Sequence, residues 1–309
     1  SLLVNGVADP KRAIFTANDG TNGNELWVTD GSPGGTVLFK DINAGAAGSF
    51  ASGWVPVGTH AVFTAGDATN GNELWVSDGT AGGTTLLANL NAGAADASPV
   101  FLGYLVTTGT PDTGKAMFVL SDGTTGREIW VTDGTAGGTV QLKDINPGAG
   151  GSSPSAWAQV GSHAVFSANN GTSGQELWVS DGTGGGTALL LDAASGLAGS
   201  DPEILGYLLV NGVVDFTKLL VPLDDVTNGR ELWVTDGTTG GTVLFKDLNT
   251  GSVGSDPGAW TAVGSHAVFV ATTAAAGTEL WVSDGTAGGT AVLKDARPGA
   301  ASAAPELLG

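Results

Sequence analysis

Short apolar runs separated by turn-forming residues fill the chain from end to end. One representative stretch has such runs at residues 54–57, 60–65, 73–77 and 84–88. The pair Gly58-Thr59 between the first two runs suits a two-residue hairpin turn, and Asp, Asn and Gly fill the later connections. No segment shows the periodicity of an amphipathic helix. The pattern predicts an all-β fold built from units of about four short strands.

The pattern recurs because the sequence contains an internal repeat. The string Glu-Leu-Trp, once Glu-Ile-Trp, begins at Glu25, Glu73, Glu128, Glu176, Glu231 and Glu279. The gaps are 48, 55, 48, 55 and 48 residues, so two unequal halves form one unit of 103 residues. Three such units, residues 1–103, 104–206 and 207–309, account for the whole sequence. Self-similarity at a fixed period is typical of repeat architectures.

The length of the half unit indicates a particular architecture. A period near 50 residues with four strands is typical of a β-propeller blade. In the strand that begins at Glu25, Trp27 is expected on one face and Leu26 on the other, so both faces need an apolar neighbour. The six halves therefore predict a six-bladed β-propeller with four-stranded antiparallel blades and three-fold sequence pseudo-symmetry, a single domain over residues 1–309. The N-terminal strand is expected to complete the last blade. An open β-solenoid and two three-bladed bodies are the alternatives.

The two kinds of half differ in one place. The odd halves carry seven extra residues in their first hairpin, for example at residues 104–115. A longer hairpin explains the alternating spacing without an additional strand. These hairpins are expected to project from one place on alternate units.

Composition narrows the possible functions. The 30 acidic residues outnumber the 11 Lys and Arg, which gives a net charge of −19. Such a surface repels phosphate backbones and anionic lipid, which argues against a nucleic-acid or membrane-surface protein. The chain has no Cys, so it holds no disulfide and no zinc-thiolate site. No apolar run is long enough to predict a membrane span.

At the Glu-Leu-Trp strings the chain resembles the bacterial ELWxxDGT-repeat proteins. The motif stands at residues 25–31, 73–80 and 279–286, among others, and recurs six times over the whole chain. Ile129 replaces the Leu once, and Ser32-Pro33 replaces Thr-Ala in the first unit. The resemblance implies a secreted or surface-exposed bacterial protein with propeller-like repeats. It implies no catalytic residue.

The repeated acidic and aromatic residues predict structural roles. We expect the carboxylates to cap turns and to accept hydrogen bonds between blades, and the motif Trp residues to pack in the interior. This structural set consists of Glu25, Trp27, Asp30, Glu73, Trp75, Asp78, Glu128, Trp130, Asp133, Glu176, Trp178, Asp181, Glu231, Trp233, Asp236, Glu279, Trp281 and Asp284.

Calcium binding is a second interpretation for some of the acidic residues. Segments such as residues 19–25 offer several oxygen ligands, and their leading acids are Asp19, Asp67, Asp122 and Asp225. Ca²⁺ takes about six to eight oxygen ligands. The equivalent positions in the other two halves are Asn170 and Thr273, so only some repeats would bind the ion. We expect no bound cofactor, and calcium at these residues is the alternative.

Two further sets follow the 103-residue period and are candidate ligand-binding residues. His60, His163 and His266 each open a strand, and three equivalent imidazoles on one axis would bind a metal ion. Hydrogen bonding to the local backbone is the alternative role. Trp54, Trp157 and Trp260 would form three equivalent sugar-stacking sites, with core packing as their alternative.

These observations favour a protein without catalytic activity. No Gly-x-Ser-x-Gly elbow and no phosphate-binding loop occurs, and the repeated acids lie in similar surroundings, which does not separate their pKa values. We expect an extracytoplasmic bacterial scaffold that docks on a protein partner or a larger envelope assembly. A carbohydrate-binding lectin with three equivalent sites is the alternative, and a hydrolase or lyase comes third.

Overall fold

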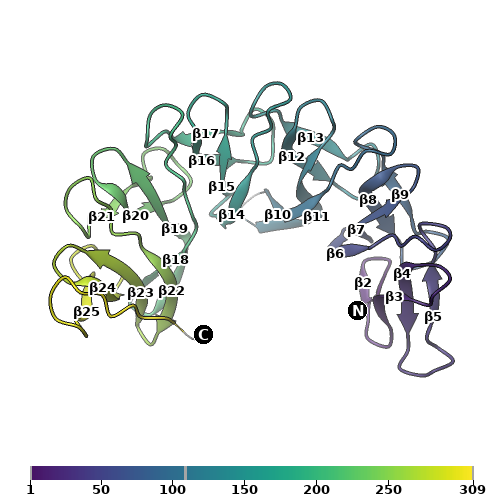
Figure 1. The fold of residues 1–309 in the computed structure, drawn as a ribbon, viewed down its shortest axis with the longest axis horizontal. Coiled ribbons are helices and arrows are strands. Elements are labelled where there is room, and N and C mark those ends of the chain that lie inside the picture. The colour runs from purple at the N-terminus through teal and green to yellow at the C-terminus, as the bar shows by residue number, and fades with distance from the viewer. Residues whose placement is uncertain (1, 108–109, 308–309) are drawn as a thin grey trace. The chain divides into compact units, whose positions relative to one another are not determined.

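The chain folds into a series of antiparallel β-sheets (Figure 1). The computed structural model describes residues 2–107 and 110–307, and over these residues it contains 25 strands and no helix. Consecutive strands pair with one another, so every sheet is a simple meander. The predicted all-β fold is thereby confirmed.

Five sheets have four strands each, in the chain order expected for a propeller blade. The first two contain β6 (Ser52–Val57), β7 (His60–Asp67), β8 (Gly71–Ser77) and β9 (Thr85–Ala88), then β10 (Val100–Thr107), β11 (Thr110–Ser121), β12 (Arg127–Thr132) and β13 (Val140–Lys143). The third contains β14 (Ser155–Val160), β15 (His163–Asn169), β16 (Gln175–Ser180) and β17 (Ala188–Leu191). The last two contain β18 (Gly206–Val210), β19 (Val213–Asp225), β20 (Gly229–Thr235) and β21 (Val243–Lys246), then β22 (Gly258–Val263), β23 (His266–Thr273), β24 (Gly277–Ser283) and β25 (Ala291–Lys294).

The first repeat departs from this plan, so the prediction of six four-stranded blades is wrong. The described residues form seven sheets, because the first repeat supplies two small ones. One is the hairpin of β1 (Leu2–Val4) and β2 (Val7–Asp9), and the other contains β3 (Ala13–Asn18), β4 (Asn24–Thr29) and β5 (Val37–Lys40).

A tight turn explains the division of the first repeat. Asp9 and Pro10 occupy the first two positions of a turn that is closed by a hydrogen bond from the Arg12 amide to the Asp9 carbonyl oxygen. The Asp9 carboxylate also accepts hydrogen bonds from the Lys11 amide and from Nε of Arg12. In the third repeat Phe216 stands at the position of Pro10, and β19 continues through it, although its register against β18 shifts there.

The sheets also fail to follow a three-fold pattern. Residues 100–191 and 206–294 each form two four-stranded sheets, whereas residues 2–88 form three sheets of two, three and four strands. The expectation that the N-terminal strand completes the last sheet is wrong as well. Strand β1 pairs with β2, and the last sheet takes all four of its strands from residues 258–294.

Contacts divide the chain into two compact units. The first comprises Ser1–Leu105 and Pro111–Ser153, and the second comprises Val106–Thr110 and Pro154–Gly309.

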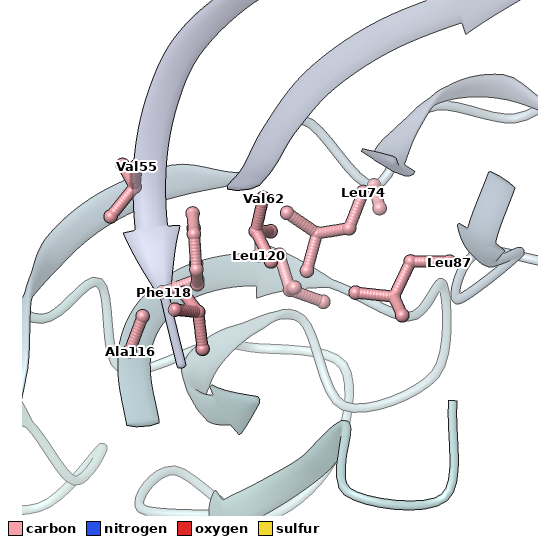
Figure 2. Packing of buried hydrophobic residues seen from close by; sticks show 9 residues of the cluster. Val55, Val62, Leu74, Leu87, Ala116, Phe118 and Leu120 are labelled. Atoms are coloured by element: carbon pink, nitrogen blue, oxygen red, sulfur yellow. The ribbon is translucent and has the colours of Figure 1, made fainter. Parts of the chain in front are cut away.

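Within each unit, neighbouring sheets bury apolar side chains between their faces. In the first unit, Val62 and Leu74 from the β6–β9 sheet lie against Phe118 and Leu120 from β11 (Figure 2). All four side chains are buried. In the second unit the β14–β17 sheet packs in the same way on β19, and the β18–β21 sheet on β22–β25. Burial of such a side chain contributes roughly 1.5–3 kcal/mol, so sheet-on-sheet packing is the main source of stability.

Candidate functional site

The Glu of each Glu-Leu-Trp string is a buried anchor for a loop. Glu128, at the start of the third strand of its sheet, accepts hydrogen bonds from the amides of Ile145 (3.0 Å), Asn146 (3.2 Å) and Ser152 (2.8 Å), and from the Ser152 hydroxyl. The other five bind the equivalent loops in a similar way. All six are at most 1% exposed. Burial raises the pKa of Glu73, Glu128, Glu176 and Glu231.

The Asp of each Asp-Gly pair holds the turn after that strand. Oδ1 of Asp133 accepts hydrogen bonds from the Thr135 hydroxyl (2.7 Å) and amide (2.9 Å). These bonds lower the pKa of Asp133. A Cβ atom at Gly138 would overlap the same carboxylate, so the turn requires glycine there. The same arrangement occurs at Asp30, Asp78, Asp181, Asp236 and Asp284.

The Trp of each string lies on the sheet beside a partner on the second strand. That partner is Phe for five of the six, and Val221 for Trp233. Trp75, Trp178 and Trp281 are 6% exposed, and the other three are half-buried. Among the described residues, no hydrogen-bond acceptor reaches the buried Nε1 of any of the six. Nothing in the structure explains these unpaired donors.

The calcium candidates are also engaged in turns. Oδ1 of Asp19 accepts hydrogen bonds from the amides of Thr21 and Asn22 (both 2.8 Å), and the bonds from Asn22 and Thr21 lower its pKa. Asp67, Asp122 and Asp225 make the same two backbone contacts. No three His, Asp or Glu side chains in the described part of the chain gather closely enough to hold a metal ion.

The three His residues belong to three different four-stranded sheets. Nδ1 of His60, His163 and His266 lies 3.2, 3.5 and 3.1 Å from the hydroxyl of the residue before it. His60 and His163 each also border the Asp-Gly turn of the next sheet, at Gly134 and Gly237. Each imidazole therefore has a local hydroxyl neighbour within its own sheet.

The second Trp set lies on irregular first strands. Trp54, Trp157 and Trp260 are half-buried, and the register of each strand shifts at the Trp. Trp54 stacks on Phe63 with ring centres 4.9 Å apart, and Trp260 stacks on Phe269 at 5.5 Å. One face of each of these two indoles is therefore occupied by the protein.

An exposed apolar hairpin stands out among the surfaces of the second unit. The turn between β18 and β19 presents Val213 and Phe216, which are 69% and 65% exposed, and Val214 beside them is 40% exposed. We call these three residues the hairpin patch. Sequence reasoning predicted a projecting hairpin here but did not single out its residues. The apolar Val213, Val214 and Phe216 within a predicted loop were the available signal.

The preceding sheet holds the hairpin in place. The Tyr207 hydroxyl donates a hydrogen bond to the Gln159 carbonyl oxygen (2.7 Å), and the Phe216 carbonyl oxygen accepts one from the Gly161 amide (3.4 Å). The Tyr207 and Phe216 rings meet edge to face, with centres 4.9 Å apart. Together with Thr217, these residues line a hollow of about 380 Å³. The hairpin patch is thus a fixed surface with a recess beside it.

The equivalent hairpins of the first and second repeats do not show the same apolar patch among the described residues. In the first repeat, the β1–β2 turn exposes Val7 to 70% but has Pro10 in place of the aromatic residue. The tip of the hairpin predicted at residues 104–115 includes residues 108–109, which lie outside those described. In the described part of the chain there is also no helix of the length and apolarity that a bilayer span requires.

Comparisons with known proteins give only remote structural likenesses. No protein-family model and no characterised protein matches the chain by sequence. A solved puromycin hydrolase is similar over 94% of this chain and 45% of its own, with 15% identity and a TM-score of 0.42. TolB from Acinetobacter baumannii is similar over 92% and 68%, with 14% identity and a TM-score of 0.39. The β-propeller domain of the Trilobed protease from Pyrococcus furiosus is similar over 93% and 81%, with 13% identity and a TM-score of 0.38. The chain thus spans less than half the length of the hydrolase, and likeness at this level assigns no activity.

Proposed function

We propose that the chain is a non-catalytic, extracytoplasmic bacterial binding protein that docks on a protein partner through the hairpin patch. The observation that carries the proposal is the placement of Val213, Val214 and Phe216, exposed on a hairpin whose base is fastened to the neighbouring sheet. Exposed apolar groups on a fixed support next to a recess are typical of a binding surface. A side chain of the partner would fill the recess beside Phe216.

The charge of the chain indicates what surrounds that side chain on the partner. The net charge is −19, so the long-range field attracts a basic surface and repels an acidic one. We therefore expect an apolar contact residue on the partner within a rim of Lys and Arg. Association should slow as salt is added, because salt screens this attraction.

The engagement of the repeated acids supports the absence of catalysis. The six motif Glu residues bind loop amides, and the six motif Asp residues bind turn donors. A carboxylate that serves as a structural acceptor is not free to exchange protons with a substrate. The extracytoplasmic location is supported by the resemblance at the Glu-Leu-Trp strings.

The lectin alternative has less support: Trp54 lines a hollow of about 220 Å³, but only in the first of the three repeats among the hollows found here. Sugar stacking needs an open indole face, and Phe63 and Phe269 each occupy one face of Trp54 and Trp260. A glycan array remains the direct measurement for it.

The proposal is tested with two hairpin variants and one matched control. Phe216→Asp and Val213→Asp place a charge in the patch, whereas Val253→Asp does so at a site of similar exposure, 73%, on the loop after β21. An envelope protein captured by the wild-type chain is identified and purified, and its affinity for each variant is measured. We expect both hairpin variants to weaken binding at least about ten-fold and the control to leave it unchanged.

Two results would contradict the proposal. One is a partner that binds all three variants with the same affinity. The other is the absence of any stoichiometric partner for the wild-type chain in its native envelope extract. Thermal unfolding of each variant shows that the substitutions leave the fold intact.

A further inference from the structure

The first unit contains a polar hollow of about 300 Å³ between its first and second Glu-Leu-Trp repeats. One wall is the loop after β5, with Asn43 and Phe50, and the other is the start of β8, with Asn72. Asp96 from the loop after β9 completes it. All lining residues belong to the first unit, so that unit alone forms the hollow. Its volume is at the lower end of the range for small-molecule sites, roughly 300–1,000 Å³.

Hydrogen bonds hold the two walls of the hollow together. The Gly66 amide, near the end of β7, donates to the Ser49 carbonyl oxygen (2.9 Å). The Ala68 amide, in the turn that follows, donates to Oδ1 of Asn43 (3.2 Å). Because these bonds already join the loop to the neighbouring sheet, a ligand would bind to a preformed site and would order little of the chain.

Two polar side chains of the hollow keep unused hydrogen-bonding capacity. Oδ1 of Asp96 accepts a hydrogen bond from the backbone amide of Asn72 (2.7 Å), and no described residue donates to Oδ2. The side-chain amide of Asn72 also has no partner among the described residues. Asp67 differs, since both of its carboxylate oxygens accept from the Asn70 side chain. The hollow therefore offers a carboxylate acceptor and an amide that both donates and accepts.

The aromatic residue of the hollow is one that stability does not explain. Phe50 has a φ of +50°, in the left-handed region, where a bulky side chain is strained. Its side chain is 70% exposed, so little burial offsets that strain. All six repeats adopt this conformation here, and the other five carry smaller side chains: Ser98, Ser153, Asp201, Asp256 and Ala304. Strain of this kind is typical of functional positions.

Asp96 departs from the repeat as well. Gly stands at the equivalent position in four of the other repeats, and Ser302 stands there in the fifth. The pair formed by Phe50 and Asp96 thus occurs once in six repeats, on a scaffold that is otherwise copied. A single departure at two positions of one hollow indicates a specific ligand rather than a requirement of the fold.

We infer that this hollow binds one neutral sugar ring. The C–H face of a pyranose would lie on the apolar Phe50 ring, and its hydroxyl groups would donate to Asp96 and pair with the Asn72 amide. The net charge of −19 disfavours an anionic sugar. A cation would leave both N–H donors of the amide without a use. The site is separate from the three equivalent Trp positions, and it goes beyond the proposed docking on a protein.

The test measures sugar binding to the full chain by saturation-transfer NMR. The probes are the methyl glycosides of β-glucose, β-galactose and α-mannose, with glucuronic acid as the charged probe. We expect at least one neutral glycoside to bind, and Phe50→Ala and Asp96→Asn each to weaken it at least about five-fold. Asp96→Asn keeps an acceptor for the Asn72 backbone amide. Ser98→Ala, at the equivalent left-handed position, is the matched control and should bind like the wild type.

Three results would overturn the inference. They are the failure of all three neutral glycosides to bind, tighter binding of glucuronic acid, and equal binding by Phe50→Ala, which would place the sugar elsewhere. Thermal unfolding checks the fold, and because Phe50 is exposed its replacement should not lower the melting temperature. Phe216→Asp should bind the glycoside like the wild type, so this inference and the hairpin proposal succeed or fail separately.

Discussion

At the scale of single residues, the repeated acids divide into two physical types. The motif Glu carboxylates are buried and each binds a loop, and burial raises the pKa of Glu128. The motif Asp carboxylates lie in turns near the surface, where the hydrogen bonds from Thr135 lower the pKa of Asp133. The two types therefore respond in opposite ways when the pH falls.

The buried type gives a prediction for pH dependence. Because the pKa of Glu128 is raised on folding, its contribution to the free energy of unfolding is complete below the ordinary value of 4.5 and is lost as pH rises through the folded-state pKa. The Glu128→Gln side chain does not titrate, and its NH₂ group faces backbone N–H donors that it cannot accept from. The substitution should therefore lower the free energy of unfolding by roughly 2 kcal/mol at neutral pH. The difference in the free energy of unfolding between the wild type and Glu128→Gln should be larger at about pH 4 than at about pH 7.

Denaturant unfolding of both chains at the two pH values measures that difference. Glu203→Gln is the control, because its carboxylate is 64% exposed. An advantage that stays constant or shrinks on acidification would contradict the assignment of Glu128 as a buried, desolvated acceptor.

The Asp turns give a second residue-scale prediction. Gly138→Ala would push its Cβ into the Asp133 carboxylate and break the bonds from Thr135, at a cost of about 1–3 kcal/mol. Gly137→Ala is the matched control, since open space surrounds that position. Thermal unfolding of the two variants compares them directly. Equal melting temperatures would show that the turn tolerates a side chain at Gly138.

At the scale of elements, most strands could be predicted from the sequence, and their irregularities could not. The run predicted at residues 60–65 is the core of β7 (His60–Asp67), and that predicted at 54–57 is the end of β6 (Ser52–Val57). The register shift around Trp54 could not be predicted from the pattern of apolar positions, because it accompanies a positive φ angle at Gly53. The break between β2 and β3 could be predicted, since the pair Asp-Pro favours a turn.

That break leads to a prediction for Pro10. Pro10→Thr restores a backbone donor and removes the preference for the turn, so β2 and β3 should join into one strand, as the equivalent residues 215–219 belong to the single strand β19 despite its register shift. Backbone chemical shifts of residues 9–13 would move from turn values toward strand values. Unchanged shifts would mean that the bonds between Asp9 and Arg12 hold the turn without the proline.

At the scale of the whole molecule, the repeat predicted the kind of sheet but not the number of sheets. Period, strand count and apolar positions are local properties, and they describe the five four-stranded sheets well. Whether a surface is covered is a property of its neighbours. Val57 and Val263 occupy equivalent positions of the repeat, yet Val57 is buried and Val263 is exposed. Phe216 was missed as part of a site for the same reason, because nothing in its own segment tells whether the adjoining sheet covers its ring.

The loop anchors also bear on how the protein is made. Glu128 finds all its partners within the next 24 residues, and every sheet pairs only strands that are consecutive in the chain. Because these contacts are local in sequence, each sheet can fold on the ribosome while the next is still being translated. Strands then have little opportunity to pair with the wrong partner. Duplication of the gene segment that encodes one 103-residue repeat would therefore add two sheets that already contain their own loop-anchoring hydrogen bonds.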